Sequence, residues 1–412
     1  MTVQALTMKS RDMLRDLIAT YWKQVKEAPL QGRRVAWCSG ISPIDLLKVM
    51  DFTLVFPENY AATCSARKVS TMFCERAESF GYSPDVCSYA RNGLGSVLSG
   101  DVEHCPVGGL PRPDLLLINS YCAPITKWFE ELSRFFKVPL IIVEQPFRHD
   151  NLNPQENKEL VRQAMQQLRD IVAFLEQFTR KRFDYDRLQE SVAVSSQCSL
   201  LWNEVLEMGK HIPAPFTCFD YFNSLFPIMC LRGEPATVTY YQQLKSDLAE
   251  RASRKIGAIP QEKYRLYWDN IPIWFKLREL SQKFASYNAN LITGIYPYTW
   301  ALTDLDPKQP LESITRSMIY FVTNAGIRGR ADFITKLVQD YSLDGLVAQS
   351  SRSCRLMNMG QYDIMNLVTQ RTGCPAVFIE GDMCDERVYS ESEVDSKIDA
   401  FMELLAQRSR AS

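Results

Sequence analysis

The sequence predicts an α/β protein with two doubly wound parallel-sheet domains and a helical segment between them. The length of 412 residues exceeds one ordinary core, because domains commonly hold roughly 100 to 200 residues. Short apolar runs alternate with helical patterns near both ends of the chain, which indicates parallel sheets with right-handed crossovers. The middle lacks such runs. The predicted parts are a helical segment at 1–30, a first α/β domain at 31–152, a helical segment at 153–258 and a second α/β domain at 259–412.

The N-terminal segment and the first α/β domain follow from capping residues and apolar runs. A helix rich in Lys, Arg, Leu and Gln is expected to end before Pro29 and Gly32. The run Leu115–Ile118 is continuously apolar, which is typical of a parallel strand buried on both faces. The elements predicted after the first helix are the strands 34–38, 53–56, 115–118 and 140–143, and the helices 44–50, 65–80 and 124–136.

In the remaining chain, the pattern of predicted elements changes twice. Long helical patterns run from Pro154 to about Gly257 without a convincing strand. After Pro260 the alternation of short apolar runs with helices returns. The elements predicted there are the strands 264–268, 290–295, 345–349 and 376–379, and helices at 274–287, near 311–341, around 360–371 and from 392 onward.

The two α/β regions read as copies of one design. The stretch Asp114–Cys122 leads through a helix to Pro139–Glu144, and Asp344–Cys354 leads through a helix to Pro375–Glu380. Each copy therefore combines an aspartate, a buried strand, a cysteine, a helix and a second strand that ends in glutamate.

A further pair of similar segments lies upstream, where Phe56–Ala61 corresponds to Tyr296–Ala301. The alternative interpretation is that buried parallel strands that end in proline or polar turns always look alike. If the repeat is real, Cys122 and Cys354 occupy equivalent places just past the carboxyl end of a strand. Ligands of open α/β sheets bind at that edge.

Composition and motifs exclude several classes of function. The formal net charge of −1 offers no basic surplus for nucleic acid binding, so no nucleic acid partner is predicted. No apolar run approaches the roughly 18 residues of a membrane span, and no signal peptide is evident at the N-terminus. There is no phosphate-binding P-loop, no GxSxG motif and no HExxH motif. We expect a cytoplasmic protein without a membrane partner, whose cysteines are reduced.

The twelve cysteines are the unusual part of the composition, and none forms a CxxC pair. Cys87, Cys122 and Cys354 stand in polar, loop-like contexts, where thiolates from distant segments can converge on a metal or cluster. The alternative for any of them is a small buried hydrophobe. Glu58 follows Pro57 at a strand end, the position of a catalytic carboxylate. An exposed loop glutamate is the alternative.

The chain resembles the 2-hydroxyacyl-CoA dehydratase and benzoyl-CoA reductase family from about residue 30 to its C-terminus. The resemblance rests on the segments VAWCSGISPIDLL, VFPENYAATCSARK, GYSPDVCSYAR, NSYCAPITKWFE, YPYTWAL, RSCRLM and IEGDMCDERVYSESEVDSKIDAFMELL. These segments occur in the order that the family shows. The most specific are PENYAA and the cysteines of CSYAR and RSCR. The resemblance is strongest to the subunit that holds the substrate-binding cluster.

The resemblance implies an oxygen-sensitive heterodimer of two related subunits, with a [4Fe-4S] cluster between the two sheet domains of this chain. The matching ligands are Cys87, Cys122 and Cys354, which leave one iron open. A separate ATP-hydrolysing iron-sulfur activator supplies one electron. The implied reaction is loss of water from an (R)-2-hydroxyacyl-CoA through a ketyl radical to give a 2-enoyl-CoA, and Glu58 is the implied catalytic residue.

The substrate is less well defined by the resemblance. Trp37, Ser39, Gly40, Tyr298 and Arg352 match positions near the substrate. Gly40 stands where the dehydratases have a serine, and Tyr298 stands where they have a histidine. Two alternatives therefore stay open: a component of an ATP-dependent benzoyl-CoA (aryl-CoA) reductase, and a component that only relays electrons.

Overall fold

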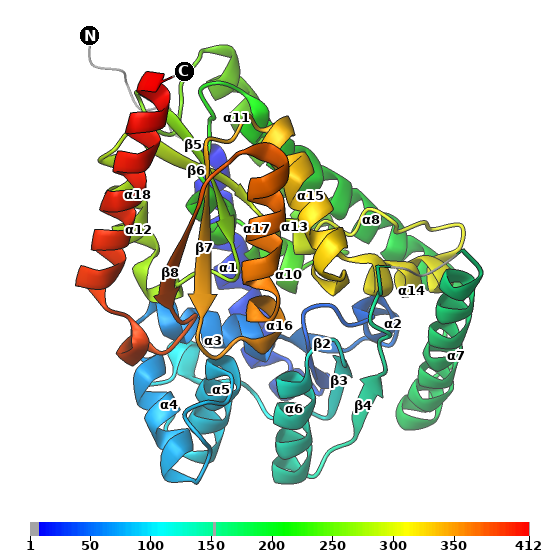
Figure 1. Ribbon diagram of the computed structural model, residues 1–412. Coiled ribbons are helices and arrows are strands. Elements are labelled where there is room, and N and C mark those ends of the chain that lie inside the picture. The colour runs from blue at the N-terminus through cyan, green and yellow to red at the C-terminus, as the bar shows by residue number, and fades with distance from the viewer. Residues whose placement is uncertain (1–7, 151–153, 412) are drawn as a thin grey trace.

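The computed structural model describes residues 8–150 and 154–411, and its fold is built on two four-stranded sheets (Figure 1). All strand pairs within both sheets are parallel. The first sheet has the order β2-β1-β3-β4, and the second has the order β6-β5-β7-β8. The predicted α/β class with two parallel sheets is confirmed. The strands are β1 Val35–Cys38, β2 Thr53–Val55, β3 Leu115–Asn119, β4 Leu140–Val143, β5 Tyr264–Asp269, β6 Ala289–Gly294, β7 Gly345–Ser351 and β8 Ala376–Gly381.

The two sheets repeat one another in detail. Each joins its strands in the same relative order, with the second strand at one edge and the first strand beside it. The carboxylate of Asp114 accepts a 2.8 Å hydrogen bond from the backbone N–H of Val35, and Asp344 accepts one of 2.8 Å from Arg265. Burial of apolar strands alone does not require this shared side-chain contact. The structure therefore supports the repeat that the sequence predicted.

Helices surround both sheets (Figure 1). In the second domain, α12 and α18 lie on one side of the sheet, and α15 and α17 lie on the other. The α-helices are α1 Lys9–Glu27, α2 Ile44–Val49, α3 Pro57–Ala66, α4 Ser70–Ser79, α5 Ser88–Leu98, α6 Ala123–Phe136, α7 Pro154–Thr179, α8 Tyr185–Glu207, α9 Cys218–Asn223, α10 Phe226–Cys230, α11 Pro235–Ser253, α12 Leu277–Ala285, α13 Ile295–Thr299, α14 Pro310–Tyr320, α15 Ile327–Asp340, α16 Arg355–Asn358, α17 Gln361–Thr372 and α18 Glu391–Ala411. Within the described chain, none of them is long and apolar enough to cross a bilayer.

Short 3₁₀ turns complete the element order. They are η1 Pro29–Gln31, η2 Pro106–Gly108, η3 Met208–Lys210, η4 Trp274–Lys276, η5 Val322–Asn324 and η6 Glu386–Val388. The elements between β4 and β5 are all helical over the described residues, as the sequence predicted for the middle segment. The residue limits of the four parts stay a prediction, and the limit between residues 152 and 153 lies outside the described residues.

One predicted helix was wrong in its bounds. The helix expected over residues 65–80 is two helices, α3 and α4, and α3 begins eight residues earlier, at Pro57. Proline is favoured in the first turn of a helix, because its fixed φ suits the helix and its missing N–H would have no partner there. The helical conformation is interrupted between α3 and α4 at Lys68, whose φ is 58°.

The glycine-containing stretch after Cys87, for which no element was predicted, forms the helix α5. A Cβ at Gly95 would lie 1.8 Å from the backbone carbonyl oxygen of Phe73, and one at Gly93 would lie 2.1 Å from the ring of Trp128. These glycines therefore let α5 pack closely against α4 and α6. This packing explains why a helix contains residues of low helix propensity.

The two domains meet where the strands of the second sheet end. Figure 1 shows β7 and β8 running toward α3, α4 and α5 of the first domain. The hydroxyl of Ser65 donates a 3.0 Å hydrogen bond to the carbonyl of Met383. The thiol of Cys384 contacts the carbonyl oxygen of Ala61 at 3.5 Å. The carboxyl ends of β7 and β8 therefore face a buried boundary with the first domain.

Candidate active site

A cavity of about 70 Å³ lies between the two domains. It collects residues from the segments that follow every strand except β4, and the carboxyl edge of the strands is where open α/β sheets bind ligands. The residues that line it are Ile41, Glu58, Cys87, Tyr89, Tyr121, Cys122, Ile125, Ile271, Tyr296, Thr299, Trp300, Phe321, Thr323, Cys354, Leu356, Met357 and Met383. The three cysteines and the glutamate that the sequence singled out thus line one cavity.

Each of the three cysteines stands immediately before a helix. Cys87 precedes α5, Cys122 precedes α6 and Cys354 precedes α16. Loops between a strand or turn and a helix place their side chains at the domain boundary, so three distant segments deliver one thiol each to the cavity. Over the described chain, no three His, Cys, Asp or Glu side chains already converge closely enough to hold a metal ion.

Burial dominates the acidity of these thiols. Loss of hydration raises the pKa of Cys122 to about 12 and that of Cys354 to about 11. Burial also raises the pKa of Cys87 well above its usual value, and the charges of the other two cysteines add to the rise. The thiols are therefore protonated at neutral pH when nothing is bound, and binding of a cation would release protons.

Glu58 is held at the cavity wall by two hydrogen-bond donors. It lies in the first turn of α3, where its Oε2 accepts a 2.7 Å hydrogen bond from the backbone N–H of Gly40. Its Oε1 accepts a 2.9 Å hydrogen bond from the hydroxyl of Tyr121. Burial raises the pKa of Glu58, and the two donors only partly offset that rise. A carboxyl group with a raised pKa and a fixed orientation is suited to accept a proton from a bound substrate.

Gly40 contributes backbone rather than side chain to the site. A Cβ at this position would lie 2.4 Å from the indole Cη2 of Trp300. The ring of Trp300, which lines the cavity, therefore occupies the space that a side chain at Gly40 would need. The glycine also lets its N–H approach Glu58, which the sequence did not indicate.

The other residues predicted to contact substrate lie outside this cavity wall. The indole N–H of Trp37 donates to the carbonyl of Pro111. The hydroxyl of Ser39 bonds to that of Ser42 at 2.8 Å. Neither side chain lines the cavity, so their contact with substrate stays a prediction.

Tyr298 and Arg352 are also placed apart from the cavity. The hydroxyl of Tyr298 donates to Glu207 at 3.1 Å and lies 2.6 Å from the hydroxyl of Tyr341. Arg352 is exposed, and its backbone N–H pairs with Gly381. In the repeat, Tyr298 corresponds to Glu58, so the same position faces the cavity in one domain and packs against α8 in the other.

The sequence did not indicate the aromatic wall of the cavity. Tyr89, Tyr121, Tyr296 and Trp300 line it, and Tyr89 accepts a hydrogen bond from the indole N–H of Trp274. Two signals were available, because Tyr121 adjoins a predicted cluster cysteine and Tyr296 lies in the repeated segment. Tyr89 and Trp274 meet only through the contact of the two domains, which no sequence pattern indicates.

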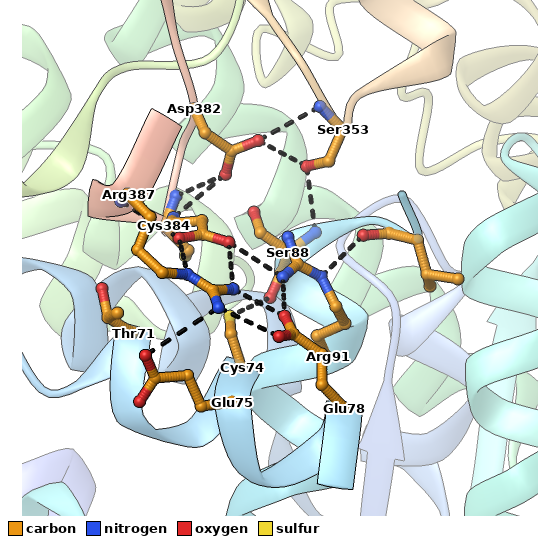
Figure 2. Close-up of polar contacts among 12 residues, drawn as sticks. Thr71, Cys74, Glu75, Glu78, Ser88, Arg91, Ser353, Asp382, Cys384 and Arg387 are labelled. Atoms are coloured by element: carbon orange, nitrogen blue, oxygen red, sulfur yellow. Dashed lines mark hydrogen bonds and ion pairs between the residues drawn. The ribbon is translucent and has the colours of Figure 1, made fainter. Parts of the chain in front are cut away.

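A hydrogen-bonded bridge joins the segments that carry Cys87 and Cys354 (Figure 2). The backbone N–H of Ser88 donates to the hydroxyl oxygen of Ser353 at 3.0 Å. That hydroxyl donates in turn to Oδ2 of Asp382 at 2.5 Å. All three residues of the bridge are buried. The separation of the two cysteines is therefore set by direct contacts between the domains.

Beside this bridge lies a cluster of four charged side chains, Arg91, Glu78, Asp385 and Arg387, which we call the interdomain ion cluster. Figure 2 labels Arg91, Glu78 and Arg387. Arg91 contacts Glu78 at 2.6 Å and Asp385 at 2.8 Å. Arg387 contacts the same two carboxylates at 2.6 and 2.7 Å. Burial opposes ionisation of Asp385, but hydrogen bonds from Arg387 and Arg91 outweigh it and lower its pKa. The cluster joins α4 and α5 to the loop after β8.

Comparison with known proteins shows the family to which the chain belongs. The family model described as 2-hydroxyglutaryl-CoA dehydratase, D-component, matches residues 38–405. The chain is 28% identical over 409 residues to the (R)-2-hydroxyisocaproyl-CoA dehydratase alpha subunit of Clostridioides difficile, with 98% of this chain and 97% of the relative covered. It is 28% identical to the (R)-phenyllactyl-CoA dehydratase alpha subunit of Clostridium sporogenes, with 98% and 97% covered. It is 30% identical to a component of the benzoyl-CoA reductase of Thauera aromatica, with 88% and 87% covered.

Proposed function

Because the chain belongs to the 2-hydroxyglutaryl-CoA dehydratase D-component family, we propose that it is a subunit of an oxygen-sensitive iron-sulfur dehydratase. The proposed reaction removes water from an (R)-2-hydroxyacyl-CoA and yields a 2-enoyl-CoA. The observation that supports this proposal is the single cavity lined by Cys87, Cys122, Cys354 and Glu58. The names of the relatives add support, since several are dehydratase subunits.

The residues of the cavity fit a [4Fe-4S] cluster. Cys87, Cys122 and Cys354 line one cavity and lie near enough for their charges to raise one another's pKa. A cluster binds each cysteine through a different iron, so three separated thiolates suit it. Cys87, Cys122 and Cys354 would hold three irons and leave the fourth open. When bound, the open iron supplies a Lewis acid for the thioester carbonyl of the substrate.

Glu58 is the proposed proton acceptor. One electron enters the thioester carbonyl from an ATP-hydrolysing iron-sulfur activator, and the resulting ketyl radical expels the 2-hydroxyl as hydroxide. The carboxylate of Glu58 then takes a proton from C3 and passes it to the hydroxide, which becomes water, and the product radical gives up its electron for the next turnover. Gly40 and Tyr121 orient the carboxylate through their hydrogen bonds. Its raised pKa makes it a stronger base than an exposed glutamate.

The apolar wall of the cavity protects this chemistry from water. Ile41, Ile125, Phe321 and Met357 line it, and these side chains carry no acidic proton that could protonate the ketyl radical anion. A dry site also strengthens the electrostatic contacts made inside it. We therefore propose that the chain binds and orients the substrate, and that its apolar residues protect the radical.

The proposed assembly is a heterodimer with a homologous second subunit. Several relatives are named as alpha subunits of their enzymes, which supports a partner for this chain. The activator protein and an acyl-CoA complete the proposed partners. We propose a cytoplasmic location.

The direct test is anaerobic purification of the complex, followed by iron analysis and turnover with a panel of 2-hydroxyacyl-CoA thioesters, activator and ATP. We expect about four irons per chain with a broad thiolate-to-iron absorbance, and formation of 2-enoyl-CoA. A chain that binds no iron after full reconstitution contradicts the proposal.

A second candidate is a component of an aryl-CoA reductase. It is favoured by the 30% identity to the benzoyl-CoA reductase component and by Gly40, where the dehydratases have a serine. The same complex would then reduce the ring of benzoyl-CoA and release no water from 2-hydroxyacyl-CoA. Product analysis with both substrates separates the two candidates.

A further inference from the structure

A second, larger cavity adjoins the candidate active site. Its volume is about 390 Å³, and it shares Tyr121, Cys122, Thr323 and Leu356 with the first cavity. It opens toward solvent beside Met359, whose side chain is 76% exposed. The second cavity therefore lies between the solvent and the wall that carries Cys122.

Arg330, on α15, lines this second cavity and is unusual for a buried cation. Only 4% of its surface is exposed. Its Nε and Nη2 have no hydrogen-bond partner within residues 8–150 and 154–411. Its nearest carboxylate oxygen belongs to Asp269, 3.9 Å from Nη2, which is beyond the range of a hydrogen bond.

Asp269 is held by other donors. Its Oδ1 accepts a 2.8 Å hydrogen bond from Tyr267, and its Oδ2 accepts one of 2.6 Å from Gln361. These two contacts fix the carboxylate at its distance from Arg330. The guanidinium is therefore only partly neutralised, and its planar fork of N–H donors is left for another oxygen-bearing group.

We infer that Arg330 binds an anionic oxygen group, a carboxylate or a phosphate, of the acyl-CoA that enters the active site. The inference rests on the proposed function, because it takes the neighbouring cavity as the place of reaction. A guanidinium pairs with carboxylate and phosphate oxygens through two parallel N–H donors. Buried N–H groups without a partner are costly, and a ligand anion removes that cost.

The position of Arg330 in the fold supports this assignment. Asp269 ends β5, and the neighbouring strand β7 carries Gln349 and Ser351. Both of these residues also have buried side-chain atoms without a hydrogen-bond partner in the described chain. The carboxyl ends of β5 and β7 flank the point where the strand order of the second sheet reverses, and open α/β sheets bind ligands there.

Two parts of an acyl-CoA carry such an anion: the acyl chain, if it has a second carboxylate, and the phosphates of CoA. Three probes distinguish them. Glutaryl-CoA carries both groups, butyryl-CoA carries the phosphates alone, and butyryl-pantetheine carries neither. Binding of each is measured by anaerobic equilibrium dialysis against the purified iron-loaded chain, with iron content determined for every sample.

The test variants are Arg330→Met, which removes the charge at similar length, and Arg330→Lys, which keeps the charge without the fork. The matched control is Arg328→Met on the same helix, where the side chain is exposed. We expect Arg330→Met to weaken binding about 10-fold to 100-fold, the range for loss of a charge-assisted hydrogen bond, with a smaller loss for Arg330→Lys. Arg328→Met should bind all probes as the unaltered chain does.

The pattern over the probes identifies the anion. Selective weakening for glutaryl-CoA assigns an acyl carboxylate, and equal weakening for both CoA thioesters, with butyryl-pantetheine unaffected, assigns a CoA phosphate. Unchanged binding in Arg330→Met and Arg330→Lys, or an equal loss for butyryl-pantetheine, overturns the inference while the proposed function stands. If the iron-loaded, unaltered chain binds none of the three probes, both are overturned.

Discussion

Replacement of Asp385 by asparagine tests whether the interdomain ion cluster holds the two domains together. Its side chain is 3% exposed and contacts the 2% exposed side chain of Arg91 at 2.8 Å. Removal of one partner from a buried ion pair costs about 3 to 5 kcal/mol, because the remaining charge stays buried without full compensation. Glu78 still contacts Arg91 at 2.6 Å, so we expect the lower end of that range.

The measurement is urea unfolding of the purified chain at pH 7, followed by circular dichroism and tryptophan fluorescence. The matched control is Asp51→Asn, which also removes a carboxylate with two cationic partners, Lys181 and Arg187. The side chain of Asp51 is 51% exposed, so its loss should lower the free energy of unfolding by less than about 1 kcal/mol. An equal effect of the two substitutions would refute the reasoning.

The dependence on pH gives an independent check of the same cluster. The folded pKa of Asp385 lies below its ordinary value of 3.8. A carboxyl with a lowered pKa contributes stability that is present above the unfolded pKa and is lost as the pH falls through the folded pKa. Asp385→Asn should therefore lose less stability than the unaltered chain when the pH falls below about 4. Parallel stability curves of the two proteins over this window would contradict the assignment.

Three further predictions concern the site itself. Glu58→Gln should lower turnover by about 10²-fold to 10⁴-fold with iron unchanged, and unchanged turnover favours a component that only relays electrons. The turnover rate of the unaltered enzyme should rise with pH through a pKa above the ordinary 4.5 of glutamate, since burial raises the pKa of Glu58. Cys354→Ser should reduce iron per chain. Cys374→Ser should retain it, because the Cys374 thiol lies 3.6 Å from the carbonyl oxygen of Leu343 and outside the cavity; equal iron in both variants excludes Cys354 as a ligand. Gly40→Ala should lower the free energy of unfolding by about 1 to 3 kcal/mol through its clash with Trp300, and Trp300→Leu in the same chain should recover part of it; additive losses would refute the steric cause.

The interdomain contacts also explain why the cavity depends on an intact domain boundary. Cys87 and Cys122 belong to the first domain, and Cys354 belongs to the second. The bridge through Ser88, Ser353 and Asp382 fixes the segments of Cys87 and Cys354 relative to each other. A loosened boundary would therefore change the spacing of Cys354 relative to Cys87 and Cys122.

Much of the fold was predictable because parallel strands leave a strong local signal. Buried strands such as Leu115–Asn119 are continuously apolar, and the structure has strands at all eight predicted places. The bounds failed where a helix began in residues that resemble a loop. Pro57 begins α3, and the glycines of α5 allow close packing of helices. Local propensity indicates neither the helix start at Pro57 nor a helix that contains these glycines.

The candidate site divides in the same way. Cys87, Cys122, Cys354 and Glu58 were singled out by sequence, through their places after strands or before helices and through the family resemblance. Tyr89 and Arg330 were not, because their surroundings come from segments far away in the chain. Nothing local distinguishes a buried arginine without a partner from an exposed one.

The sequence by itself determined the two-sheet architecture, the repeat and the family, since apolar periodicity and motif order are written along the chain. Only the tertiary structure decided which side chains meet at the domain boundary. Glu58 and Tyr298 occupy equivalent positions of the repeat, yet one faces the cavity and the other contacts Glu207. The physical reason is that a cavity wall is set by packing between distant segments, and this packing is absent from any local pattern.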